Sequence, residues 1–346
     1  MEPRIMSPDE LKQLEDGFGI KVIRQSPLRH SSSTVVALET DRGQRVAKRY
    51  PPQYTPEMVL AQQDANVHMR GLGTPTPEFY STGNGSTVMV FDGSAYILMD
   101  RLPGDVADWK DPDNTELVMQ GLALGHNGLR GFNPEGFAQP PRFTTFLVDQ
   151  AENLEGLLPA SPKSDTDRYV LGTMPYIKEV AAKSDAFWSG FLSGLPPPRR
   201  YILGDYNRES LLAKGKDITG LVVLNHIRPG FLAADVVHTL DLLAIDKETE
   251  GMELEERVDW KRMSEAMQAY HGNNPEIAAD IPLFPPLLQA KGVADVIQTW
   301  RKGYDPDASQ GQRDYFNNRV SFFVVRVDAA KRLGGRMIDV LESAIK

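Results

Sequence analysis

The sequence predicts an α+β protein in which a small five-stranded antiparallel sheet with one helix precedes a larger, mostly helical region. Short strand-like runs separated by Asp- and Gly-containing turns fill the N-terminal third of the chain. From residue 102 onward, apolar residues recur at helical spacing around a single further hairpin. A length of 346 residues allows two domains or two lobes, at roughly 100–200 residues per domain. We therefore expect an N-terminal lobe over residues 1–101 and a helical C-terminal lobe over residues 102–346.

Composition and charge narrow the function classes. The chain is 41% hydrophobic and 25% charged, as in ordinary soluble globular proteins, and it has no cysteine for disulfides or thiolate chemistry. Lys and Arg number 38 against 47 Asp and Glu, and this net charge of −9 disfavours a nucleic-acid-binding surface. The chain start lacks the order of a secretory signal, and no apolar run approaches the roughly 18 residues of a membrane span. We expect a cytoplasmic protein whose partners include neither nucleic acid nor membrane.

The first lobe is expected to begin with a short helix. Ser7 is placed to cap it, Pro8 suits its first position, Glu10 completes a capping box, and Gly17 is placed to end it. Turns that contain Asp and Gly mark two tight hairpins among the strands that follow. The expected elements are the strands 20–24, 34–40, 45–50, 87–91 and 95–99, with a helix over 56–70 between the third and fourth strands.

The second lobe is expected to be helical apart from one hairpin and two breaks, at 282–286 and 303–312. In its last long helix, Phe316, Val320, Phe323 and Val327 share one face, which predicts a continuous buried stripe. The other expected elements are helices over 115–125 and 142–158, a stretch over 187–195 that ends at three prolines, and a hairpin that pairs 210–213 with 218–224.

A series of short motifs follows in a fixed order. The most specific is the run 201–212, which reads Y-I-L-G-D-Y-N-R-E-S-L-L and precedes a strand that reads I-T-G-L-V-V-L over 218–224. The others are V-A-K-R-Y at 46–50, G-T-P-T-P at 73–77, A-Y-I-L-M-D-R-L-P-G at 95–104, L-A-L-G-H at 122–126, and Gly230 followed by Asp235. In order and spacing, these motifs resemble those of the aminoglycoside phosphotransferase and choline kinase-like family. The resemblance implies a two-lobed protein-kinase-like fold and an ATP-dependent phosphotransferase.

The same resemblance implies roles for individual residues. Asp205 corresponds to the base that orients the acceptor hydroxyl, and Lys48 to the lysine that grips the phosphates of ATP. ATP and Mg²⁺ are the implied cofactors. The nucleotide-contacting positions before the second strand and in the hinge fall on Ser31, Ser32, Ser33, Thr34, Met99, Asp100 and Leu102.

The metal-binding positions depart from the family pattern. The first ligand, usually Asn, is Ser210, and the second, usually Asp, is Val223. Mg²⁺ gives up its water reluctantly and binds poorly without a carboxylate, so Ser210, Asn207 and Asn225 are weak metal candidates. An active site would have to hold the metal with Asp205 and Asn207, or with Asn225 and Asp217 after a small shift in register. Gln62 replaces the helix glutamate that pairs with the strand lysine. These substitutions fall together on the metal-binding and lysine-positioning roles.

Plain structural readings compete with the functional ones. Lys48 also reads as a solvated strand lysine, Asp205 as a turn former, and the residues 31–34 as a polar turn rather than a phosphate cradle. The acidic stretch 248–259 suits either a guide for a cationic acceptor or a solvated helix start. The histidines, His226 among them, lack metal-ligand spacing, so each is expected to be a surface or hydrogen-bonded side chain.

Two hypotheses from different classes follow. In the first, the site is degenerate and pseudokinase-like, and the chain is a binding or regulatory protein whose partner is a nucleotide, another small molecule or a protein. In the second, the chain is an active small-molecule kinase that transfers the γ-phosphate of ATP to a hydroxyl, with Asp205 as base and non-standard Mg²⁺ ligands. The substitutions favour the first hypothesis, because fold-forming positions such as Gly204 and Gly220 persist while the metal-binding ones are lost.

Overall fold

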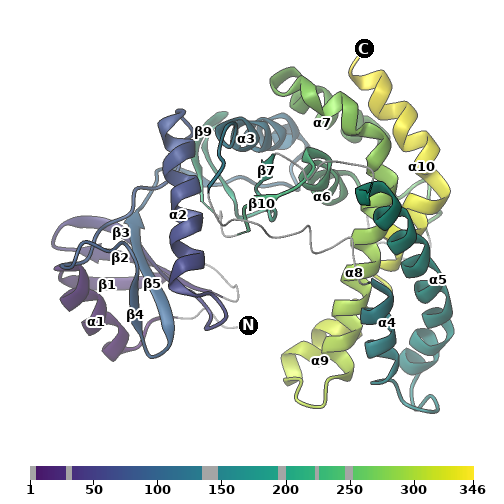
Figure 1. Ribbon diagram of the computed structural model, residues 1–346, viewed down its shortest axis with the longest axis horizontal. Coiled ribbons are helices and arrows are strands. Elements are labelled where there is room, and N and C mark those ends of the chain that lie inside the picture. The colour runs from purple at the N-terminus through teal and green to yellow at the C-terminus, as the bar shows by residue number, and fades with distance from the viewer. Residues whose placement is uncertain (1–4, 29–32, 135–146, 194–199, 223–225, 246–251) are drawn as a thin grey trace. The chain divides into compact units, whose positions relative to one another are not determined.

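The computed structural model describes residues 5–28, 33–134, 147–193, 200–222, 226–245 and 252–346 (Figure 1). The chain forms two compact units, each assembled from segments that are distant in sequence. Unit 1 comprises Met1–Asp108, Leu124–Phe137 and Asp205–Ile227, and unit 2 comprises Trp109–Ala123, Ala138–Gly204 and Arg228–Lys346. From Asp205 onward, the motif run 201–212 therefore belongs to the same unit as the N-terminal sheet. The lobe boundary expected after residue 101 stays a prediction.

Unit 1 is built on the expected five-stranded antiparallel sheet, in the order β1-β2-β3-β5-β4 (Figure 1). Because side chains alternate across a strand, Tyr96 and Leu98 join one apolar cluster with α1, and Ile97 joins another with α2. A helix thus packs on each face of the sheet. The elements are α1 (Pro8–Phe18), β1 (Val22–Pro27), β2 (Thr34–Thr40), β3 (Gly43–Arg49), α2 (Pro56–Gly71), β4 (Met89–Phe91) and β5 (Ser94–Asp100).

Capping chemistry fixes the start of α1 as the sequence predicts. The Ser7 side chain accepts the N–H of Glu10 at 3.3 Å, and Glu10 Oε2 accepts the N–H of Ser7 at 2.7 Å. The expected stop at Gly17 is wrong, because the left-handed cap is Gly19, with φ of 62°. Glycine at position 17 leaves room for Met89, because a Cβ there would lie 2.7 Å from Sδ of Met89.

A three-stranded sheet in the order β6-β8-β9 completes unit 1. Gly104, in the Leu-Pro-Gly turn, has φ of 95°, and a Cβ there would lie 2.3 Å from Oγ1 of Thr219 and 2.7 Å from the carbonyl oxygen of Ala213. Only glycine permits this close approach. The Thr219 hydroxyl also donates to the carbonyl oxygen of Pro103 at 2.6 Å. The strands are β6 (Asp105–Val106), β8 (Leu211–Lys214) and β9 (Asp217–Leu221).

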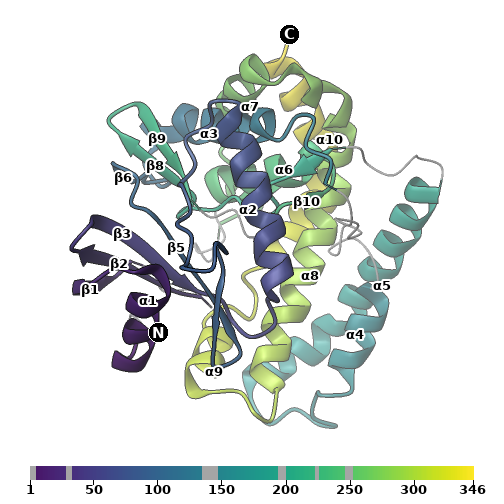
Figure 2. The same ribbon diagram turned by 60° about the vertical axis from the view of Figure 1, so that its left-hand side comes forward.

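In the residues that the structure describes, unit 2 is mostly helical and contains the short antiparallel pair β7 (Tyr201–Ile202) and β10 (Arg228–Pro229). Both views show α5 beside α4 and α10 beside α8 (Figures 1 and 2). Within the described ranges, no helix is both long and apolar enough to cross a membrane. The helices are η1 (Pro112–Asn114), α3 (Thr115–Gly128, whose last residues belong to unit 1), α4 (Leu147–Glu155), α5 (Asp165–Ser193), α6 (Leu232–Ala244), α7 (Trp260–Asn273), η2 (Pro275–Leu283), α8 (Phe284–Tyr304), α9 (Gln310–Asn317) and α10 (Val324–Ala344).

The predicted continuous helix near the C-terminus is wrong. It is interrupted by turns over 318–323, between α9 and α10. The carbonyl oxygen of Val320, which a continuous helix would use internally, accepts the indole N–H of Trp300 at 2.7 Å. The break expected at 282–286 is also wrong, because η2 ends at Leu283 and α8 begins at Phe284. Pro285 and Pro286 stand in the first turn of α8, where proline costs no helix hydrogen bond.

Candidate functional site

The backbone that leads into Asp205 is held by a buried carboxylate. Gly204 has φ of 76°, and its N–H lies 3.1 Å from both carboxylate oxygens of Asp235. Asp235 stands in the first turn of α6 and is 2% exposed. Gly204 and Asp235 both belong to unit 2, so the hydrogen bonds between them hold the backbone just before Asp205 inside that unit.

Asp205 faces an imidazole and a phenol within unit 1. Its Oδ2 lies 3.7 Å from Nε2 of His226, and the two side chains are 41% and 40% exposed. The ring of Tyr54 meets that of His226 edge-on, with centroids 6.4 Å apart. Burial, and after it the charge of Asp205, raises the pKa of Tyr54. The three side chains present an accessible carboxylate beside two aromatic rings.

Lys48 stands at the other end of this aromatic group. It is 6% exposed on β3, and its Nζ lies 4.4 Å from the centroid of the Tyr50 ring, a cation–π geometry. Tyr50 packs against Tyr54 with centroids 5.5 Å apart. The contacts therefore run from Lys48 through Tyr50, Tyr54 and His226 to Asp205, and we call these five residues the site row.

Gln62 of α2 holds the backbone next to the site row. Its Nε2 donates to the carbonyl oxygen of Ile227 at 3.3 Å, and its Oε1 accepts the N–H of Ile227 at 3.1 Å. Ile227 directly follows His226 in the chain. The Gln62 amide therefore positions the segment that carries the imidazole.

The weak metal candidates serve the loop itself. Oδ1 of Asn207 accepts the N–H of Glu209 at 2.9 Å, and Oγ of Ser210 accepts the N–H of Asn207 at 3.0 Å while Ser210 is 1% exposed. Asn225 and Val223 lie outside the described residues. No set of three His, Cys, Asp or Glu side chains in the described ranges could hold a metal ion. Among the described candidates, Asp205 and two neutral oxygens that each already accept a backbone N–H make a poor set of ligands for hydrated Mg²⁺.

The hinge residues expected to contact a nucleotide have side chains engaged in the fold. Met99 packs against the apolar cluster on the α2 face of the sheet. The carboxylate of Asp100 accepts the hydroxyl of Tyr80 at 2.6 Å. Leu102 packs on Gly220, where a Cβ would lie 2.8 Å from Cδ1 of Leu102. Nucleotide contact at these three positions stays a prediction.

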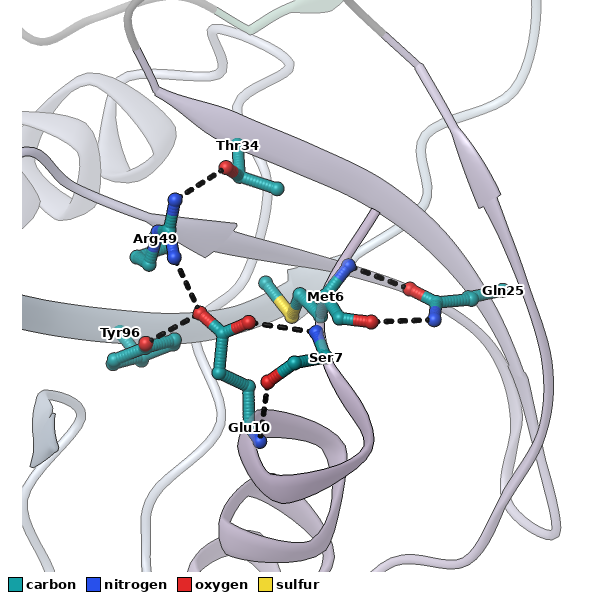
Figure 3. Close-up of polar contacts among 7 residues, drawn as sticks. All are labelled: Met6, Ser7, Glu10, Gln25, Thr34, Arg49 and Tyr96. Carbon is teal, nitrogen blue, oxygen red and sulfur yellow. Dashed lines mark hydrogen bonds and ion pairs between the residues drawn. The ribbon is translucent and has the colours of Figure 1, made fainter. Parts of the chain in front are cut away.

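A buried carboxylate network joins α1 to the sheet (Figure 3). Oε1 of Glu10 accepts from Arg49 Nη1 at 2.6 Å and from the Tyr96 hydroxyl at 2.7 Å, while Arg49 Nη2 donates to Thr34 Oγ1 at 3.2 Å. Burial alone would raise the pKa of Glu10, but the hydrogen bonds from Ser7, Tyr96 and Arg49 outweigh it and lower that pKa. Burial and the bond to Glu10 raise the pKa of Tyr96 to about 12. We call this set the Glu10 network.

The proposed phosphate-cradle residues divide between the described and undescribed parts of the chain. Ser31 and Ser32 lie outside the described residues. Ser33 and Thr34 are 7% and 1% exposed, and the Thr34 hydroxyl belongs to the Glu10 network. A phosphate contact at these four positions stays a prediction.

Sequence reasoning did not propose three members of the site row as site residues. Tyr50 appears there only as the last residue of the V-A-K-R-Y motif. Tyr54 was not a candidate, although it stands in a Pro-rich connection immediately before α2. His226 was expected to be a surface or hydrogen-bonded residue, and nothing local signals that it faces Asp205. The signal that was available is its place, three residues after the expected metal-ligand position at Val223.

The chain is similar to known phosphotransferases in sequence and in fold. A model of the phosphotransferase enzyme family matches residues 24–270. An aminoglycoside phosphotransferase from Alicyclobacillus acidocaldarius is similar in structure, at 14% identity and a TM-score of 0.66, with 96% of this chain and 97% of that chain covered. A microcompartment-associated aminopropanol kinase has a TM-score of 0.65 at 14% identity, with coverage of 94% and 97%. The kinase-like α+β fold predicted from the sequence is confirmed.

Two further relatives extend the comparison. An amicoumacin kinase solved with AMP-PNP and Ca²⁺ has a TM-score of 0.63 at 11% identity, with 93% of this chain and 92% of that chain covered. Spore coat protein S of Bacillus subtilis (strain 168) is 26% identical over 102 residues, which are 30% of this chain and 28% of that protein. The match to the spore coat protein therefore spans less than a third of either chain.

Proposed function

The chain belongs to the phosphotransferase enzyme family, and from this premise we propose that it is a degenerate, pseudokinase-like member that binds a nucleotide or a related small molecule without two-metal phosphoryl transfer. The observation that carries the proposal is the state of the loop oxygens. Those of Asn207 and Ser210 accept backbone N–H groups of their own loop, so the neutral oxygens at two expected metal positions already hold the loop itself. Kinase-type transfer relies on metal ions that bridge the phosphates.

The site row supplies groups for binding. Lys48 provides a cation for phosphate, and the rings of Tyr54 and His226 provide aromatic surface beside it. The Asp205 carboxylate is accessible to accept a hydrogen bond from a hydroxyl of the ligand. The amicoumacin kinase with this fold was solved with AMP-PNP, which supports a nucleotide as the class to test first.

An active small-molecule kinase is the second candidate. The 41% exposure of the Asp205 side chain favours it, because a general base must reach its substrate. In that reaction the acceptor oxygen bonds to the γ-phosphorus as the bond to the bridging oxygen breaks. The acceptor proton passes to Asp205 and ADP leaves.

Thermal unfolding with ATP separates the two candidates, since a ligand that binds only the native state raises stability. We expect ATP to raise the melting temperature equally in Mg²⁺ and in EDTA. Lys48→Met should abolish the shift, while Lys214→Met, a matched change at an exposed lysine of β8, should retain it.

Two results would contradict the proposal. A shift that requires Mg²⁺, with ATP turnover that Asp205→Asn abolishes, would establish the active kinase. The absence of a shift with any nucleotide would remove nucleotide binding from both candidates.

A further inference from the structure

A second place to bind a small molecule lies within unit 2. It is a cavity of about 640 Å³, inside the range of about 300–1,000 Å³ typical of ligand sites. Its walls come from Tyr169 of α5, from the segment 252–257, from the turns 318–323, and from the first three turns of α10. The helix break that the sequence did not predict therefore forms part of this cavity.

Three arginines line the cavity, and two of them are held in place. Nε of Arg257 donates to the carbonyl oxygen of Met252 at 3.2 Å, and the Arg319 guanidinium lies 4.5 Å from the centroid of the Tyr315 ring. Arg332 approaches from α10 and is exposed. Guanidinium groups that are already positioned lose little entropy when they bind a planar or tetrahedral oxyanion.

The remaining lining is partly acidic and partly apolar. Of its two carboxylates, Asp328 accepts the Tyr176 hydroxyl at 2.8 Å, and Glu253 is exposed. The charged lining is thus cationic by one unit, with three arginines against these two acids. Phe322 and Val325 add half-buried apolar surface between the charges. The cavity suits a ligand with both an anionic and an apolar part.

The cavity is distinct from the loop that leads into Asp205. Asp235, near the start of α6, binds the N–H of Gly204, whereas the segment that lines the cavity is bridged to the end of α6 through Ile245 and Val258. A helix of 13 residues is about 20 Å long at about 1.5 Å per residue. The two places therefore lie at opposite ends of α6.

We propose that the cavity between α5, α10 and the segment 252–257 binds a small molecule that carries an oxyanion, phosphate or carboxylate, on an apolar group. Arg257, Arg319 and Arg332 bind the oxyanion, and Phe322 and Val325 contact the apolar part. This site is independent of the function proposed for the site row.

Calorimetric titration of the full chain with phenyl phosphate, phenylacetate and benzyl alcohol tests the proposal. We expect at least one of the two oxyanion probes to bind with a Kd of about 1 mM or tighter, and the neutral alcohol not to bind. The stronger of the two oxyanion probes identifies the headgroup. Arg332→Gln should weaken its binding about tenfold, the usual effect of losing a charged hydrogen bond, whereas Arg301→Gln, at an exposed arginine of α8 outside the cavity, should not.

Two further variants test whether the oxyanion probe binds in this cavity. Ser321→Trp, at an exposed lining position, should block the cavity and abolish the titration. Lys48→Met should leave the titration unchanged, since Lys48 belongs to unit 1. The proposal fails if neither oxyanion probe binds, if benzyl alcohol binds as tightly, if binding survives both Arg332→Gln and Ser321→Trp, or if Lys48→Met removes it.

Discussion

Two carboxylates of unit 1 stand beside a basic side chain and a tyrosine, yet their surroundings differ. Glu10 is 7% exposed and accepts hydrogen bonds of 2.6–2.7 Å from Arg49, Tyr96 and the Ser7 backbone. The Asp205 side chain is 41% exposed and lies 3.7 Å from His226, beyond hydrogen-bond distance.

The comparison separates a structural carboxylate from one that is free to bind a ligand. A buried carboxylate whose two oxygens both accept hydrogen bonds is costly to remove and has little capacity left for a ligand. An exposed carboxylate with a distant partner contributes little to stability and keeps that capacity. Glu10 is of the first kind and Asp205 of the second, and the changes below test this assignment.

The largest effect on stability is expected from Glu10→Gln. It leaves the Arg49 guanidinium in a partly buried place without its charged partner, so we expect a loss of about 2–3 kcal/mol in the free energy of unfolding. Urea unfolding followed by circular dichroism measures the loss. Asp9→Asn, at an exposed position in the same helix turn, should change stability by less than about 0.5 kcal/mol. Equal losses in both variants would contradict the assigned role of Glu10.

The pH dependence of the free energy of unfolding also tests the structural role of Glu10. The folded state lowers the pKa of Glu10 below its ordinary value of 4.5. The stabilisation by the ionised Glu10 carboxylate is therefore fully present at a pH above the ordinary pKa of 4.5. It is lost as the pH falls through the lower pKa of the folded state. The difference in stability between wild type and Glu10→Gln should shrink in acid. A difference that stays constant down to the acid transition would show that the carboxylate charge is not responsible.

A smaller loss is expected from Gln62→Ala. The variant removes two hydrogen bonds to the Ile227 backbone, so we expect about 1–2 kcal/mol of destabilisation. Hydrogen exchange of the Ile227 amide should accelerate more than that of the sheet amides. Asp64→Ala, at an exposed position of α2, is the matched control and should leave that exchange unchanged. Unchanged exchange in Gln62→Ala would remove its positioning role.

The smallest effect on stability is expected from His226→Gln. Exposed ion pairs contribute about 0–1 kcal/mol, so the free energy of unfolding should change by less than about 0.5 kcal/mol. Affinity for the ligand of the site row should fall instead, because an aromatic ring beside Asp205 is lost. Titration calorimetry and urea unfolding on one sample measure both quantities. A large loss of stability without a change in affinity would place His226 with the structural residues.

Local patterns made much of the fold predictable. The capping box of α1 and the tight Asp-Gly turn between β4 and β5 depend on residues within a few positions of each other, and both appear as expected. The break at 318–323 was not predictable, because the competing donor for the Val320 carbonyl is Trp300, which is distant in sequence.

The candidate site was predictable in its motif positions but not in its contacts. The spacing around Asp205 and Lys48 indicated which residues to consider. The role of Thr34 depends on Arg49 across the sheet, and that of Gln62 on Ile227, 165 residues away. A sequence pattern identifies a side chain and its neighbours in the chain, whereas these partners are set by tertiary packing.

The central claim is that the site row binds its ligand without Mg²⁺, and the ratio of ATP affinities with and without the metal tests it most directly. Calorimetric titration of the wild-type chain in Mg²⁺ and in EDTA gives this ratio. The account predicts two measurable dissociation constants that agree within about a factor of two, a difference of less than about 0.5 kcal/mol. An affinity at least about tenfold higher in Mg²⁺ would contradict it, since that dependence would mean that a metal ion helps to hold ATP on the site row.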